Sequence, residues 1–455
     1  MPDFSQKHPK VTTFYNLNPN NNLLQDLIQH SRWEKPVLFL PTLATEFTIP
    51  KNRPAFENIV AELAGASYLN NIILGVDNAT EAEVHQAVGI FKRYGIKNYL
   101  VQWNDGPRFS EVYSLIEKAG YDLSLRGKGR NLFMGVGVCI ALGATSVGFL
   151  DTDIKTFRRE QLDRLFFPVV VLGYQFSKAF YARWSDRRLY GRVKRLLLDP
   201  LLMALKRKFT ESQNAKLLRI VDFILFFNYQ LSGEMVVDMS LLKRMRLALN
   251  WGVELFTLIE VYRKANQIAQ VEFSTGPFDH KHQRIAAEDP DTGLHRMSID
   301  IISILFYALI IEEGLDISDT FFRDLAITYQ SIADDTIKKY ADNAKFNGFI
   351  YDREAEERLV HEVIARAIIN AGELLEAPQE IAHRFLHFIT SHPEFEPFID
   401  KGLLQTILSV EQRLKGSLSL TGELPEWERV MERIPDVIEY IVDALEGDKR
   451  VFMAR

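Results

Sequence analysis

The chain has 455 residues, 47% of them hydrophobic, and its 54 Lys and Arg residues against 60 Asp and Glu give a formal net charge of −6. This length and hydrophobic content predict two folded domains, or one domain with a large appendage, and exclude extensive disorder. The acidic balance argues against a general nucleic-acid binder, which needs a basic surface, so any anion site must be local.

Targeting and redox features indicate the cytoplasm. The first residues, MPDFSQKHPK, lead into an Asn-rich segment instead of an apolar leader. The longest apolar runs, residues 220–231 and 301–311, are typical of buried helices and not of membrane spans. The single cysteine, Cys139, lies in an apolar stretch and is interpreted as a core residue in a reducing compartment. We therefore expect a cytoplasmic protein without a membrane partner.

From residue 36 onward, short apolar runs alternate with longer amphipathic ones, which is the rhythm of parallel β-α-β units. The strand-like runs are PVLFLP, NIILGVD and KNYLVQW, and the helix-like stretches begin near residues 56, 81 and 109. Each strand-like run ends in polar or turn-forming residues, as at Asp77-Asn78. Because the carboxyl ends of parallel strands form the ligand-binding edge of such a sheet, we expect the site there.

A predicted helix over about residues 128–142 leads into the apolar strand TSVGFLDTD, which ends in two carboxylates. After residue 176 the composition becomes basic, and we expect helix up to about residue 225. The strand-like AQVEF follows further on. The chain thus divides into an N-terminal extension (1–35), a Rossmann-like nucleotide-binding α/β domain (36–285) and an all-α region (286–455) of amphipathic helices. We interpret the all-α region as serving oligomerisation or the support of a lid, and expect a homodimer.

Asp151 and Asp153 are the strongest candidate site residues. Two carboxylates one residue apart at the end of a strand form a hard oxygen site for Mg²⁺ or Mn²⁺ bridging a diphosphate. The alternative is a helix N-cap beside a turn Asp. A second such triplet, at residues 289–291, lies in a Pro-containing loop without a preceding strand and is set aside. Downstream, His280 or His282 offers a third ligand, although a single loop His usually has no such role.

Three further sets of residues can bind ligands: a lysine at a helix start, two segments with a glycine and a glutamate, and a basic cluster. Lys128 lies between two glycines at the start of a predicted helix, where backbone N–H groups and an ammonium can face a phosphate, although such pairs are common. Gly233-Glu234 and Gly252 to Glu254 place carboxylates beside glycines, where they can accept hydrogen bonds from sugar hydroxyls; helix capping is the alternative for Glu254.

The third set is a basic cluster with interleaved aromatic residues. We interpret it as a pocket for an acceptor with a phosphate or carboxylate, because Arg forks bind both groups bidentately; a solvated helix face is the alternative. RNA stacking is disfavoured by the overall charge. The basic residues are Lys178, Arg183, Arg187, Arg188, Arg192, Lys194 and Arg195.

Taken in order, LPTLATEF, GKG, FLDTDI, YGRVKRLLLDPLL, LSGE, WGVE and FDHKHQ resemble the glucosyl-3-phosphoglycerate synthases and, more loosely, the mannosylglycerate synthases, both GT-A glycosyltransferases. The likeness covers about residues 36–283. It implies a GT-A fold and a metal-dependent, retaining transfer of a hexose from a UDP- or GDP-sugar to 3-phosphoglycerate, towards a glucosylglycerate-type compatible solute. It implies no covalent enzyme intermediate, because the leaving diphosphate assists the acceptor hydroxyl on the same face.

The resemblance and the motifs together assign the site residues. The metal ligands are Asp151, Asp153 and His280, and the catalytic residues are Lys128, Asp153 and Glu254. The donor-binding residues are Pro41, Thr42, Leu43, Glu46, Asp77, Lys128, Asp151, Gly233, Glu234 and Glu254. The acceptor-binding residues are Arg183, Gly191, Arg192 and Lys194.

The chain differs from the family pattern at two places. Ala44-Thr45-Glu46 replaces an Asn-Glu pair after the first strand, and Lys194 replaces a small hydroxyl residue of the acceptor loop. Two alternatives therefore stay open beside the leading hypothesis. One is transfer from a GDP-sugar to glycerate or a related acceptor, and the other is a non-catalytic nucleotide-sugar-binding scaffold.

Overall fold

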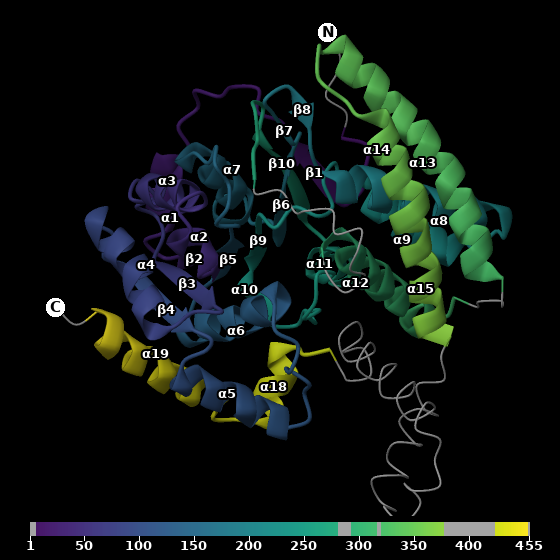
Figure 1. The fold of residues 1–455 in the computed structure, drawn as a ribbon. Coiled ribbons are helices and arrows are strands. Elements are labelled where there is room, and N and C mark those ends of the chain that lie inside the picture. Colours follow the sequence, from purple (N-terminus) through teal and green to yellow (C-terminus); the bar gives the residue numbers. More distant parts are fainter. Residues whose placement is uncertain (1–5, 281–292, 316–319, 377–423, 454–455) are drawn as a thin grey trace, which may run out of the picture.

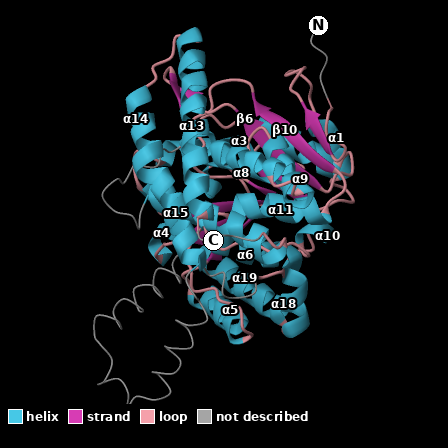
Figure 2. Ribbon diagram, turned by 90° about the vertical axis from the view of Figure 1, so that its right-hand side faces the viewer, coloured by secondary structure: helices cyan, strands magenta, loops and turns pink. Residues whose placement is uncertain are grey.

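An eight-stranded sheet with helices on both faces forms the centre of the computed structural model, which describes residues 6–280, 293–315, 320–376 and 424–453 (Figures 1 and 2). All neighbouring strands are parallel except β9, which runs antiparallel to β5 and β6. The α/β prediction is confirmed. In sheet order the strands are β1 (Val11–Phe14), β10 (Ile268–Ser274), β6 (Phe176–Tyr181), β9 (Met235–Asp238), β5 (Ser146–Phe149), β2 (Pro36–Leu43), β3 (Asn71–Asp77) and β4 (Tyr99–Trp103).

The central strand β2 shows why its sequence is a continuous apolar run. Val37 and Phe39 belong to the apolar core on one face of the sheet, and Leu38 and Leu40 belong to the core on the other. Successive side chains of a strand point to opposite faces, so a strand covered by helices on both sides needs apolar residues throughout.

The helices between these strands begin close to the predicted positions. The one that starts at Glu81 has a capping box, in which the Thr80 side chain accepts from the N–H of Glu83 and the Glu83 side chain accepts from the N–H of Thr80. The helices of this part are α1 (Leu24–His30), α2 (Thr45–Thr48), α3 (Arg53–Leu63), α4 (Glu81–Arg93), α5 (Pro107–Lys118), α6 (Lys128–Ala141) and α7 (Arg159–Val170).

The prediction of helix directly after residue 176 is wrong. Residues Phe176–Tyr181 form the fully buried strand β6, and a two-stranded hairpin of β7 (Trp184–Ser185) and β8 (Arg188–Leu189) follows. Lys178 is buried within β6, where its ammonium donates to the carbonyl of Ser232 at 2.7 Å, so this basic residue does not mark a solvated helix face.

Among the described residues after this hairpin, the regular elements other than β9 and β10 are helices. They are η1 (Val193–Leu198), α8 (Asp199–Glu211), α9 (Ala215–Phe226), α10 (Met239–Leu242), α11 (Val253–Lys264), α12 (Gly293–Tyr307), η2 (Ala308–Glu312), α13 (Phe321–Phe346), α14 (Arg353–Arg358), η3 (Leu359–Ile364), α15 (Ala365–Glu376), α18 (Trp427–Arg433) and α19 (Val437–Met453).

The first strand and the last helix of the described chain both pack against the central domain (Figure 1). Strand β1 pairs with β10, and α19 packs on α5 and α6. The Trp427 indole stacks on Phe133 of α6 with a ring separation of 4.8 Å. The division at residues 35 and 285 stays a prediction, and its second boundary lies outside the described residues.

One helical segment, Gly293–Ile310, is long and apolar enough by composition to cross a membrane, and 72% of it is buried inside the protein. Its side chains include Ile302, Leu305 and Phe306, which belong to the larger apolar core. Such burial is what the core helix of a soluble protein shows.

Candidate active site

The strands bring candidate residues from distant parts of the chain to one edge of the sheet. Asp151 and Asp153 follow the carboxyl end of β5, and His280 lies beyond the carboxyl end of β10. Because β9 is antiparallel, its amino end lies at the same edge, with Met235 opposite Phe149. Glu234, the residue before β9, therefore approaches Asp151 across the sheet.

Lys128, the first residue of α6, is at the centre of this group. Its Nζ lies 2.6 Å from Oδ1 of Asp151 and 2.8 Å from Oε1 of Glu254. Burial alone would lower the pKa of Lys128, but the two carboxylates outweigh this and raise it above its usual range. The lysine is therefore a fixed cation held between two acids.

Glu254 lies in the first turn of α11, where the helix dipole favours a negative charge. Its side chain is only 10% exposed, and Lys128 is its ion-pair partner. The N-cap residue is Gly252, without a side-chain capping bond, so Glu254 does not cap the helix. Its role in sugar binding stays a prediction.

Gly233 is required by close packing. A Cβ at this position would lie 2.5 Å from Nζ of Lys128 and 2.6 Å from Oδ2 of Asp151, much closer than real Cβ atoms approach. A larger residue here would therefore have to displace the side chains of Lys128 and Asp151.

We expect Gly233→Ala to lower kcat/KM by about 10- to 100-fold, because the added methyl displaces Lys128 and Asp151, and a 1 Å misplacement costs about that much. Steady-state kinetics would measure this. The matched control is Gly89→Ala in α4, where a Cβ meets nothing within 4 Å. Equal activity of Gly233→Ala and the wild type would contradict the packing argument.

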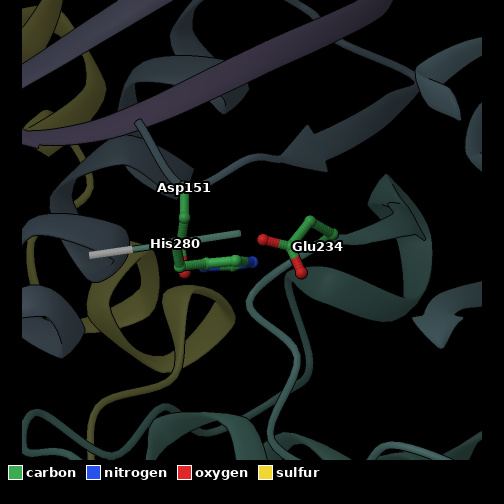
Figure 3. A group of neighbouring side chains, drawn as sticks. All are labelled: Asp151, Glu234 and His280. Atoms are coloured by element: carbon green, nitrogen blue, oxygen red, sulfur yellow. The ribbon is translucent and has the colours of Figure 1, made fainter. Parts of the chain in front are cut away.

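Asp151, Glu234 and His280 can supply metal ligands. One ligand atom from each lies within 4.8 Å of the others, and Figure 3 shows the Glu234 carboxylate and the His280 ring pointing toward one another, with Asp151 beside the ring. Within the described part of the chain, Oε1 of Glu234 and Nε2 of His280 are buried without a hydrogen-bond partner. Buried polar atoms are normally paired, so these orphaned atoms fit a cation.

Asp153 lies on the other side of the imidazole. Its Oδ1 is 3.5 Å from Nδ1 of His280. Burial would raise the pKa of Asp153, but His280 and the more distant Arg183 and Lys128 hold it below its usual range. Glu234 shows the opposite: burial and the charge of Asp151 raise its pKa, and its Oε2 accepts from the Tyr181 hydroxyl at 2.6 Å. Asp153 is therefore the more strongly anionic of the two.

The predicted acceptor residues divide between two neighbouring cavities. Arg183, Gly191 and Arg192 line the cavity that also contains Lys128 and the two aspartates. Lys194 lines only an adjacent cavity, which Arg183 and Gly191 also line, and forms an ion pair with Asp199. Gly191 adopts a φ of 79°, a left-handed conformation that favours glycine.

The predicted donor residues of β2 and β3 lie at the same sheet edge, outside the cavity around Lys128. The Thr152 hydroxyl donates to the carbonyl of Pro41 at 3.3 Å, which joins this segment to the two aspartates. Thr42 and Glu46 are buried, whereas Leu43 is 47% exposed.

The carboxylate of Asp77 marks the end of β3. Burial and the neighbouring Asp105 raise its pKa to about 6, while Arg126 forms an ion pair with Asp105 at 2.7 Å. The carboxylates of Asp77 and Asp105, together with Arg126, form a polar group at the carboxyl ends of β3 and β4. Arg126 lies two residues before Lys128 in the sequence.

Sequence reasoning missed three features of the site. Glu234 was expected to bind the donor, and the structure places it among the candidate metal ligands. Tyr181 orients Glu234, and Tyr229 stacks on Tyr181 with ring centres 4.9 Å apart. Glu234 reaches the candidate metal ligands because β9 is antiparallel to β5. The sequence does not reveal strand direction, so it offered no signal for this position.

Comparison with known proteins adds two curated relatives and a set of solved structures, while no protein-family model matches the chain. The glucosyl-3-phosphoglycerate synthase of Persephonella marina is 35% identical over 386 residues, covering 83% of this chain and 92% of the relative. The glucosyl-3-phosphoglycerate synthase of Methanococcoides burtonii is 30% identical over 379 residues, covering 82% of this chain and 89% of the relative.

The solved structures include glucosyl-3-phosphoglycerate synthase from Mycobacterium tuberculosis in complex with Mn²⁺, UDP-glucose and phosphoglyceric acid. Its TM-score is 0.47 at 22% identity, covering 67% of this chain and 89% of that chain. A complex of the same enzyme with Mg²⁺ and UDP has a TM-score of 0.46 at 21% identity, with 68% and 88% covered.

Proposed function

This chain belongs to the glucosyl-3-phosphoglycerate synthase family of metal-dependent glycosyltransferases, and we propose that the cavity around Lys128 transfers glucose from UDP-glucose to 3-phosphoglycerate. The observation that carries this proposal is the composition of that cavity. Lys128 and its partners Asp151 and Glu254 line one cavity together with Asp153, His280, Arg183 and Arg192.

Asp151, Asp153 and His280 would hold Mg²⁺ or Mn²⁺, and Glu234 lies within reach as a further oxygen ligand. When bound, the ion would neutralise charge that develops on the leaving diphosphate. The orphaned atoms of Glu234 and His280 support this assignment. Gly233 allows the loop that carries Glu234 to approach closely enough.

Lys128 would stabilise the phosphate charge, since it lines the cavity as a half-buried cation whose pKa is raised by its two carboxylate partners. When the donor binds, the Lys128 ammonium would either leave Asp151 for the diphosphate or contact both groups at once. Glu254, at 10% exposure beside Lys128, would accept hydrogen bonds from the glucose hydroxyls. The β2 segment from Pro41 to Glu46, together with Asp77, would hold the nucleoside part at the adjoining sheet edge.

Arg183 and Arg192 would bind the phosphate and carboxylate of 3-phosphoglycerate, because guanidinium forks match both groups. The N–H of Gly191 can add a backbone donor beside them. Lys194, which faces the neighbouring cavity, would act on the acceptor only through the field of its charge.

We propose that the transfer retains the configuration at the anomeric carbon. The bond between that carbon and the diphosphate oxygen breaks, the acceptor hydroxyl oxygen bonds to the same face, and its proton passes to the leaving diphosphate. The surroundings support this route, because Asp151 is one of the candidate metal ligands and Glu254 is paired with Lys128, so that each carboxylate has a role other than attack on the anomeric carbon. Location in the cytoplasm and a homodimeric state stay predictions.

A coupled assay of nucleoside diphosphate release tests the proposal, with Mg²⁺ or Mn²⁺, across UDP- and GDP-sugars, with and without 3-phosphoglycerate or glycerate. We expect release from UDP-glucose that depends on 3-phosphoglycerate. Release only from a GDP-sugar with glycerate would favour the alternative transfer. Absence of acceptor-dependent release with every pair would contradict the enzymatic proposal and favour a nucleotide-sugar-binding scaffold.

A further inference from the structure

The hairpin β7–β8, directly before the acceptor residues, has an unfavourable turn. Its two central residues, Asp186 and Arg187, have φ values of 48° and 56°. A two-residue turn of this kind favours Asn and Gly, and an arginine there is strained unless neighbouring contacts hold it. Something outside the hairpin must therefore stabilise it.

The turn between α13 and α14 supplies that support (Figure 1). The N–H of Ile350 donates to the carbonyl of Arg187 at 2.8 Å. In return, Nε and Nη2 of Arg187 donate to the carbonyl of Gly348 at 3.1 and 2.7 Å. The rings of Trp184 and Phe349 lie 5.3 Å apart. A chain segment more than 150 residues away thus holds the tip of the hairpin.

The same helices also hold the other end of the acceptor segment. Arg195 in η1 has a side chain only 3% exposed, and both of its terminal nitrogens donate to the carboxylate of Glu356 in α14. The Tyr351 hydroxyl donates to that carboxylate as well. The Tyr329 hydroxyl of α13 donates to the carbonyl of Leu196 at 2.5 Å. A buried bidentate ion pair of this kind fixes geometry as well as distance.

Tyr190, Gly191 and Arg192, which line the active-site cavity, lie between these two attachments. Within the segment, the N–H of Arg195 donates to the carbonyl of Gly191 at 3.2 Å. We propose that the α13–α14 turn and helix α14, with Glu356 as the positioning residue, hold the acceptor-binding segment in its binding conformation. This inference rests on the proposed function, and it gives the C-terminal helices a specific role in recognising the phosphorylated acceptor.

The expected consequence is selective for one substrate. If only a fraction of the molecules hold the segment correctly, the apparent affinity for the acceptor falls to that fraction of its intrinsic value. Lys128, Asp151, Glu234 and Glu254 lie on or beside α6, β5, β9 and α11, and their positions do not depend on this attachment. Loss of the attachment should therefore raise KM for 3-phosphoglycerate and leave KM for UDP-glucose nearly unchanged.

The first test is Glu356→Gln, which keeps the side-chain shape and removes the charge that holds Arg195. We expect KM for 3-phosphoglycerate to rise by about tenfold, as a conformational population of roughly one tenth would give, with KM for UDP-glucose within about twofold. The matched control is Glu357→Gln, the next residue, which pairs with Arg353 on the surface at 2.6 Å. The control should retain both KM values.

Because Glu356→Gln leaves a buried arginine without its anion, that variant can lose stability, so a surface variant supplements it. Arg187→Ala removes only the exposed contacts to Gly348. We expect the same acceptor-selective rise in KM, by about threefold, with an unchanged melting temperature. If Glu356→Gln does not fold, the KM of Arg187→Ala for 3-phosphoglycerate decides whether the inference holds.

An unchanged acceptor KM in folded variants, or an equal rise for both substrates, overturns the inference. Failure of the wild type to use 3-phosphoglycerate would overturn the proposed function instead, and the two failures are thereby distinguishable.

Discussion

Replacing Asp153 with alanine is expected to lower kcat/KM for glucosyl transfer by about a thousandfold or more, because metal ions supply several kcal/mol of charge stabilisation and each tenfold in rate corresponds to about 1.36 kcal/mol. Asp153 is half-buried, and His280 beside it helps to hold its pKa below the usual range. Its removal should also weaken binding of Mn²⁺, which electron paramagnetic resonance or calorimetry measures independently of turnover.

The control for this variant is Asp163→Asn in α7, which alters a buried aspartate that is 3% exposed and paired with Arg159 at 2.7 Å, away from the cavity. Its Mn²⁺ affinity should equal that of the wild type. If Asp153→Ala binds Mn²⁺ as tightly as the wild type, the ligand assignment is wrong, and Asp151, Glu234 and His280 would form the metal site alone.

The sequence predicted the part of the site that depends on parallel strands. The apolar run of β2 is buried on both faces, so its periodicity gave the β-α-β pattern directly. Asp151, Asp153 and Asp77 follow β5 and β3 in the chain, and their position at one sheet edge follows from strand direction.

What the sequence did not reveal depends on contacts between distant segments. Glu234 joins the candidate metal ligands only because β9 is antiparallel, and no local pattern reports strand direction. Residues 176–181 were predicted as helix from their basic composition, but Lys178 is buried in β6, where burial lowers its pKa to about 8. The attachment of Glu356 to Arg195 spans 161 residues, and periodicity within one helix cannot predict such a pair.

Replacing Lys128 with methionine is expected to lower kcat by about 100- to 1,000-fold, the usual effect of removing one group that stabilises transition-state charge. Methionine has a similar length and no charge, so the cavity keeps its shape while Asp151 and Glu254 lose their shared cation. Loss of the ammonium should not weaken Mn²⁺ binding, because the ammonium and the metal ion compete for the carboxylate of Asp151. Rapid-quench kinetics at saturating substrates, together with a Mn²⁺ titration, would measure both effects.

This pair of readouts separates the lysine from the metal site. Asp153→Ala should lose both activity and Mn²⁺ affinity, whereas Lys128→Met should lose only activity. The control is Lys155→Met, which removes a lysine paired with Asp279 at 2.7 Å on a side chain that is 48% exposed. If Lys128→Met retains wild-type kcat, the ammonium does not act on the leaving diphosphate. Its pairs with Asp151 and Glu254 would then serve only to keep two carboxylates close together, because without a cation their charges repel each other.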